Sequence, residues 1–167
     1  MNDSNNICLA CGLCCDGTVL GFVQLEREEV PALKGLLNIE NDEGEGVFLQ
    51  PCSQFCDGCS IYSQRPKQCA SFKCGLLKSV EQKSVSFDRA VEVTDEVKLL
   101  KTAIVKKLAN LQIELKSKSF YFQMLELNRW FQKNEREISL SKSYLDLKSD
   151  LQEFDNLLSK EMGIPMF

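Results

Sequence analysis

The sequence contains no histidine. This absence excludes a Ser-His-Asp triad, a Cys-His catalytic pair and the HExxH zinc site of metalloproteases. The chain also has no Walker loop and no GxGxxG motif, which excludes the phosphate-binding loops built on those motifs. Any catalytic chemistry would therefore belong to a metal centre or a bound cofactor, and whether the protein is an enzyme stays open at this point.

The sequence also has fewer basic than acidic residues. The formal net charge is −4, and a nucleic-acid backbone is bound by a positive surface, so we expect no nucleic-acid partner. No apolar run has the length needed to span a bilayer, so we expect no membrane association. The first residues, MNDSNN, lack the basic and apolar regions of a signal peptide. These features together predict a cytoplasmic protein.

Two further absences divide the chain near residue 80. Glycine is missing from residues 76–162, and cysteine is missing from residues 75–167. We therefore expect a cysteine-rich module over 1–80 and a helical extension over 81–167 that packs on or beside it. The fold class predicted is α+β and predominantly α, with a small metal-stapled module followed by a long-helix hairpin or bundle.

The first part predicts little regular structure. TVLGFV at 18–23 and VFLQ at 47–50 read as short strands. Residues 25–38 predict a short helix that begins near Val30, because Pro31 disfavours the helix interior. The acidic pair Glu28 and Glu29 fits the start of that helix. We expect residues 52–74 to form a loop shaped by metal.

The second part shows helical spacing. Apolar residues recur three or four positions apart, as expected for the buried faces of packed helices. Serine-rich segments at 117–119 and 139–143 predict the joints between these helices. The three apolar stripes are Val97, Leu100, Ile104, Leu108, Leu111 and Leu115; Phe120, Met124, Leu127 and Phe131; and Tyr144, Leu147, Leu151, Phe154 and Leu158.

The chemistry of the sequence lies in its nine cysteines, which all fall within residues 8–74. In a reducing compartment, clustered cysteines indicate metal binding more than a disulfide framework. The first cluster, CLACGLCC, contains Cys8, Cys11, Cys14 and Cys15. A two-residue gap lets two thiolates converge on one ion, and Gly12 lets backbone N–H groups approach the sulfurs. The side chains of adjacent Cys14 and Cys15 tend to diverge, which favours more than one centre.

The second cluster contains Cys52, Cys56, Cys59, Cys69 and Cys74. Without histidine, a site built on these cysteines is expected to be all-sulfur, and thiolates select zinc or iron–sulfur clusters. The two clusters supply two four-coordinate centres with one cysteine over, which predicts a two-site or binuclear centre. Pairing Cys8 and Cys11 with Cys56 and Cys59 gives the CxxC…CxxC set of a structural zinc site. The run CxxCxxC also has the spacing of bacterial ferredoxins, without their fourth cysteine and proline.

Three pieces of the sequence resemble the YkgJ-like CxxCxxCC cysteine-cluster family, a zinc- or iron-chelating domain. They are CLACGLCC at 8–15, PC at 51–52 and CSIYSQRPKQCASFKC at 59–74. The resemblance covers about residues 8–80 and implies a metal-binding module. Similar domains occur in proteins linked to flagellin lysine methylation. The family pattern implies as ligands Cys8, Cys11, Cys14, Cys15, Cys52, Cys59, Cys69 and Cys74, with Cys56 as an additional cysteine.

The residues around the cysteines suggest how a centre would be supported. Arg65 would offset the negative charge that thiolates leave on a metal site, and Tyr62 would help to cover the sulfurs. Zinc is favoured over iron–sulfur because four thiolates close its coordination shell. The function predicted is metal binding. The alternatives are an iron–sulfur redox or protein-methylation-related enzyme, and a zinc-stapled adaptor whose C-terminal helices bind a protein partner.

Overall fold

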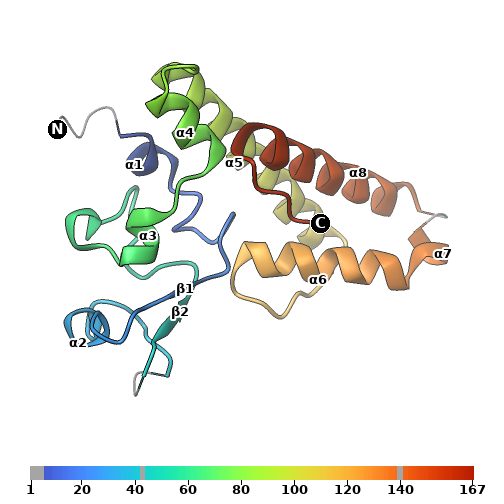
Figure 1. Ribbon diagram of the computed structural model, residues 1–167. Coiled ribbons are helices and arrows are strands. Elements are labelled where there is room, and N and C mark those ends of the chain that lie inside the picture. Colours follow the sequence, from blue (N-terminus) through green and yellow to red (C-terminus); the bar gives the residue numbers. More distant parts are fainter. Residues whose placement is uncertain (1–5, 42–43, 139–140) are drawn as a thin grey trace. The chain divides into compact units, whose positions relative to one another are not determined.

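The computed structural model describes residues 6–41, 44–138 and 141–167, and Figure 1 shows its elements. It is predominantly helical with one small sheet, which confirms the predicted fold class. The helices are α1 (Ile7–Cys11), α2 (Val30–Leu33), α3 (Lys67–Ser71), α4 (Gly75–Glu81), α5 (Phe87–Asn110), α6 (Phe120–Lys133), α7 (Glu135–Ile138) and α8 (Lys142–Leu157). The strands are β1 (Phe22–Gln24) and β2 (Val47–Leu49).

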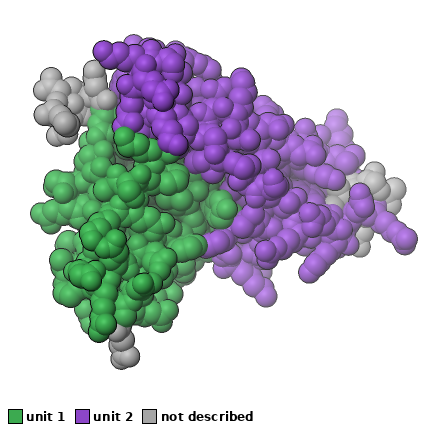
Figure 2. All heavy atoms as spheres, viewed as in Figure 1, with its two compact units in different colours: residues 1–73, 118–121 green, residues 74–117, 122–167 purple. Residues whose placement is uncertain are grey.

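The chain forms two compact units (Figure 2). Unit 1 comprises residues 1–73 and 118–121, and unit 2 comprises residues 74–117 and 122–167. The short segment 118–121 joins unit 1 through the backbone, since the N–H of Tyr121 donates to the carbonyl of Gly17 at 2.7 Å. The hydroxyl of Ser119 donates to the same carbonyl at 3.2 Å. Unit 1 thus includes a segment distant in sequence.

Unit 1 is built on the antiparallel pair β1–β2, in which Val23 lies opposite Phe48. These two side chains are buried, whereas Phe22 and Leu49 on the other face are exposed. The alternation is that of a half-buried sheet. One apolar cluster, called here the apolar core of unit 1, contains Val23, Leu25, Val30, Leu33, Leu37 and Phe48. Ile7, Leu13 and Val19 of this unit are buried as well.

The predicted elements of unit 1 are partly right. Both strands exist, with β1 beginning later than expected, and α2 begins at Val30 with Pro31 in its first turn, as predicted. That helix ends at Leu33, well before the predicted residue 38. The predicted loop over 52–74 was wrong in part. It contains a 3₁₀ turn (Tyr62–Gln64) and α3, which starts just after Pro66.

Unit 2 is a set of packed helices. Helices α5 and α8 lie against each other, and their apolar faces contain the buried residues Val93, Val97, Ile104, Leu108, Leu147, Leu151 and Phe154. Lys107 of α5 forms an ion pair with Asp150 of α8 at 2.6 Å. The ring of Trp130 in α6 lies 5.4 Å from the ring of Tyr144 in α8. The predicted helical stripes therefore face a core.

Helix α5 ends at Asn110, before the predicted stripe reaches Leu115. Gln112 takes a left-handed conformation with φ of 53°. Its N–H donates to the carbonyl of Ala109, and the N–H of Ile113 donates to that of Leu108, each at 3.1 Å. This is a Schellman cap, which usually has glycine at the left-handed position. The chain has glutamine there, so the sequence carries no obvious stop signal.

Helix α8 continues into a π-helical turn (Leu158–Met162) that packs against α4. Gly75, the first residue of α4, makes this approach possible. A Cβ at Gly75 would lie 2.9 Å from the backbone carbonyl of Met162. Predicted joints at 117–119 and 139–143 agree with the starts of α6 and α8, although residues 139–140 lie outside the described residues.

Candidate metal centre

Four cysteines of unit 1 share one neighbourhood. Cys15 follows α1, Cys52 follows β2, Cys59 lies in the next loop and Cys69 lies in α3. Burial raises the pKa of the Cys15 thiol to about 12, and the nearby thiols of Cys59, Cys52 and Cys69 contribute to the rise. The backbones also meet, since the N–H of Cys52 donates to the carbonyl of Cys15 at 2.8 Å.

Two of these cysteines rest on the apolar core of unit 1. Cys52 and Cys69 are half-buried and pack against the cluster that contains Val23 and Phe48. Burial, followed by Cys52 and Cys59, raises the pKa of Cys69 to about 12. Burial also raises the pKa of Cys52, while a hydrogen bond from the backbone N–H of Gln54 lowers it. The core therefore holds thiols from segments distant in sequence next to one another.

The four thiols lie near one another but do not form a complete coordination shell. Within the described ranges, no three Cys, Asp or Glu side chains stand at the mutual spacing of a metal site. With their raised pKa values, the thiols of Cys15 and Cys69 are protonated at neutral pH. A bound metal would replace these protons and draw the sulfurs inward. The donor set, soft sulfur without histidine, fits zinc or iron and does not fit magnesium or calcium.

The loop between Cys52 and Ser60 is a compact hairpin. The N–H of Gln54 donates to the Sγ of Cys52 at 3.5 Å, and the N–H of Ser60 donates to the carbonyl of Gln54 at 2.9 Å. An N–H directed at a cysteine sulfur stabilises the thiolate that a metal requires. Cys56 is exposed in this hairpin, and its N–H donates to the carbonyl of Gly58.

Helix α1 carries Cys8 and Cys11 within a single helical turn, where the sequence predicted a metal-binding turn. Residues three apart on a helix lie on one side of it, so the CxxC spacing still places both cysteines on the same side of α1. Gly12 ends the helix in the left-handed conformation, with φ of 70°. A Cβ at Gly12 would lie 2.6 Å from the ring of Phe55, so glycine also lets the hairpin pack here.

Cys74 begins unit 2 and caps α4. Its Sγ accepts the N–H of Leu77 at 3.4 Å. Cys14 is half-buried and follows α1. The ligand roles predicted for the nine cysteines stay predictions. Cys52, Cys59 and Cys69 lie near enough to Cys15 to raise its pKa.

Arg65 and Tyr62 form a joined pair beside Cys69. The Arg65 guanidinium lies 3.8 Å from the centroid of the Tyr62 ring and donates to the Tyr62 carbonyl at 2.7 Å. The Tyr62 hydroxyl accepts a hydrogen bond from the Asn6 amide at 2.6 Å. The positive charge of Arg65 lowers the pKa of Cys69, against the larger effects of burial and the other thiols.

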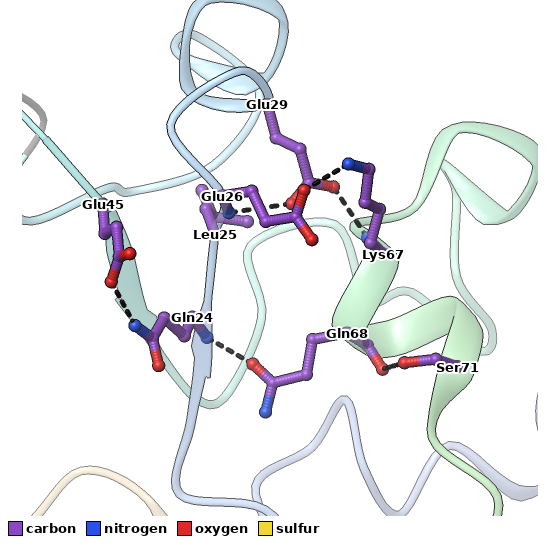
Figure 3. Close-up of a pocket in the computed structure, with 8 residues that line it drawn as sticks. All are labelled: Gln24, Leu25, Glu26, Glu29, Glu45, Lys67, Gln68 and Ser71. Atoms are coloured by element: carbon purple, nitrogen blue, oxygen red, sulfur yellow. Dashed lines mark hydrogen bonds and ion pairs between the residues drawn. The ribbon is translucent and has the colours of Figure 1, made fainter.

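Sequence reasoning missed an open cavity on the outside of α3. Its volume is about 430 Å³, and it is lined by Gln24, Leu25, Glu26, Glu29, Glu45, Lys67, Gln68 and Ser71 (Figure 3). These residues come from three separate stretches of unit 1, and their polar side chains bond to one another and to the backbone. Nothing in their spacing along the sequence indicates that they meet.

Comparison with protein families identifies the class. Residues 7–94 match the family model CxxCxxCC, described as "Putative zinc- or iron-chelating domain". The match covers more than half of the chain, so the protein belongs to this family, and the membership supports metal binding in general. No curated protein and no solved structure matches the chain. Among the described residues, no helix combines the length and the apolar character needed to cross a membrane.

Proposed function

We propose that the protein binds zinc or iron through a thiolate centre formed by Cys15, Cys52, Cys59 and Cys69. The observation that carries the proposal is that these four thiols lie near one another although they come from four separate segments. Ligation to a metal ionises such thiols, and four neighbouring thiolates repel one another unless an opposite charge joins them. A divalent metal supplies that charge, and the family membership agrees with it.

Zinc is the favoured ion. Four thiolates complete its tetrahedral shell and leave no open position, as in a structural site. Such a site would stabilise unit 1 by joining segments that are distant in sequence. An iron–sulfur cluster held by the same cysteines is the alternative, and it would add redox or methylation-related chemistry that zinc does not supply.

Purification under anaerobic conditions, with elemental analysis and absorption spectroscopy, tests the proposal. The expected preparation is colourless and carries zinc. A brown preparation whose visible absorption is bleached by dithionite would support the iron–sulfur alternative. Protein that carries neither metal and binds neither on reconstitution would overturn the proposal.

A second centre would account for the remaining cysteines. Cys8 and Cys11 lie on α1, and this helix packs against the hairpin that carries Cys56, because Gly12 faces Phe55 and Gly58 faces the Leu9 carbonyl. The proposal of two sites is supported by this packing. It expects more than one metal equivalent per chain, and Cys56→Ser is expected to lower that number without emptying the first centre. A single equivalent that all variants of α1 retain would contradict it.

The adaptor function has one specific observation in its favour. Leu99 of α5 is 71% exposed, the largest exposed fraction of any large apolar side chain among the described residues. If unit 2 binds a protein partner at this position, Leu99→Glu should abolish the binding and leave the metal content unchanged. Binding that survives the substitution would exclude Leu99 from the interface.

We place the protein in the cytoplasm, where clustered cysteines stay reduced for metal binding.

A further inference from the structure

Helix α3, which carries Cys69, is attached to the end of β1 and to the segment that follows it by a polar network (Figure 3). The Glu29 carboxylate accepts the backbone N–H of Lys67 at 2.7 Å and that of Glu26 at 2.9 Å. The Gln68 side-chain carbonyl accepts the backbone N–H of Gln24 at 2.6 Å. The Lys67 ammonium also pairs with the Glu26 carboxylate. We call Glu29 and Gln68, with the backbone groups that they bind, the α3 clamp.

Glu29 supplies a cap that α3 lacks within its own sequence. Lys67 is the first residue of the helix, and the preceding Pro66 has no side chain that could accept its N–H. The first N–H groups of a helix need acceptors from outside. Glu29, although it precedes α2, makes no capping bond to that helix. Its carboxylate instead serves a helix 38 residues further along the chain.

The clamp matters for Cys69 because α3 has only five residues. A helix of this length is not stable alone in water, so tertiary contacts set its position. Cys69 is the third residue of α3 and packs inward against the apolar core. The α3 clamp is made of polar groups that line the open cavity, and most of the residues that line this cavity are exposed. The helix is therefore held from two sides.

We propose that Glu29 and Gln68 are positioning residues of the metal centre. They fix α3 so that the Cys69 thiol faces Cys15, Cys52 and Cys59, and neither residue touches the metal. This inference rests on the proposed function, because it assumes that Cys69 is a ligand. On this inference, the residues that line the open cavity beside α3 affect the metal affinity of the centre, and the cavity need not bind a ligand.

The test compares two clamp variants with two matched controls. Glu29→Ala and Gln68→Leu remove the acceptors. Glu28→Ala removes the same charge one residue away, and Glu45→Ala removes a rim carboxylate that bonds the Gln24 side chain, at 2.7 Å. The clamp variants should weaken zinc binding about 10-fold, as loss of supporting hydrogen bonds at metal sites does. The controls should bind zinc as the wild type does, and Gln68→Glu, which keeps an acceptor, should restore affinity.

Cobalt(II) titration separates positioning from general loss of fold. The intensity of the thiolate-to-cobalt charge-transfer absorption reports the number of bound sulfurs. In Glu29→Ala we expect this intensity to fall by the contribution of one thiolate, while the helical circular dichroism signal stays unchanged. Clamp variants with wild-type zinc affinity and an unchanged cobalt spectrum would overturn the inference and leave metal binding intact. An equal effect in Glu28→Ala would also overturn it, since charge alone would then suffice. A wild type that binds neither metal would overturn the proposed function, and the inference with it.

Discussion

At the scale of single residues, the cysteines combine burial with proximity. Cys15 and Cys69 come from distant segments, yet the thiol of Cys69 contributes to the raised pKa of Cys15. The sequence predicted that these residues are ligands but not which ones meet. Spacing describes neighbours along the chain, whereas the grouping of these two with Cys52 and Cys59 depends on packing against the apolar core of unit 1.

The raised thiol pKa values predict how the metal-free protein responds to alkali. The folded pKa of Cys15 and Cys69 is about 12, against 9.0 for an ordinary thiol, so the unfolded chain loses these protons first. The contribution of these two thiols to the free energy of unfolding should therefore be unchanged below pH 9 and fall as the pH rises toward 12. Urea unfolding of metal-free protein across this range measures it. The double variant with serine at positions 15 and 69 should show a smaller fall, and an identical fall would contradict the account.

Gly12 makes a second prediction at this scale. Gly12→Ala places a Cβ against the Phe55 ring and forces a left-handed φ on an L-residue, so it should lower the free energy of unfolding by about 1–3 kcal/mol. Gly44→Ala is the matched control, because nothing lies within 4 Å of the position that its Cβ would take. Thermal unfolding of both variants checks the difference. Equal stabilities would show that the α1–hairpin contact is unimportant.

At the scale of elements, the long helices were predicted from periodicity, and the start of α2 from Pro31, whereas α3 was not predicted. The faces of α5, α6 and α8 were readable because many residues repeat the same spacing. Helix α3 was missed because its first N–H is capped by Glu29, which is distant in sequence. The end of α5 was missed because Gln112 occupies a position where glycine would have been the signal.

The cap of α5 can be improved. Gln112→Gly removes the cost of a left-handed conformation and should raise the free energy of unfolding by about 1 kcal/mol. Lys106→Gly, in the exposed interior of the same helix, should lower it by about 1 kcal/mol. Urea unfolding followed at the helical circular dichroism signal compares the two. A loss of stability in Gln112→Gly would contradict the assigned cap.

At the scale of the whole molecule, the two units differ in what holds them. Unit 2 has long helices with extended apolar faces, whereas unit 1 has short helices, a two-stranded sheet and the four neighbouring cysteines. The composition of the sequence predicted a division near residue 80. The two compact units of the structure divide after Lys73, and residues 118–121 belong to unit 1. Residues 118–121 join unit 1 through hydrogen bonds to the Gly17 carbonyl, which composition does not reveal.

Removal of metal should therefore act on unit 1. A chelator is expected to lower amide protection within residues 6–73 and to leave α5 and α8 largely protected. Hydrogen–deuterium exchange with mass spectrometry measures both units in one sample. Equal loss of protection in the two units, or none in unit 1, would contradict a metal that stabilises unit 1.

The central claim is that Cys15, Cys52, Cys59 and Cys69 form one metal centre, and the most direct measurement is metal content by elemental analysis in single serine variants. Substitution of each of the four should remove the same metal equivalent from the purified protein. Cys56→Ser should leave this equivalent in place, so adding any of the four substitutions to Cys56→Ser should lower the metal content further. Four variants that all keep the wild-type metal content would contradict the claim.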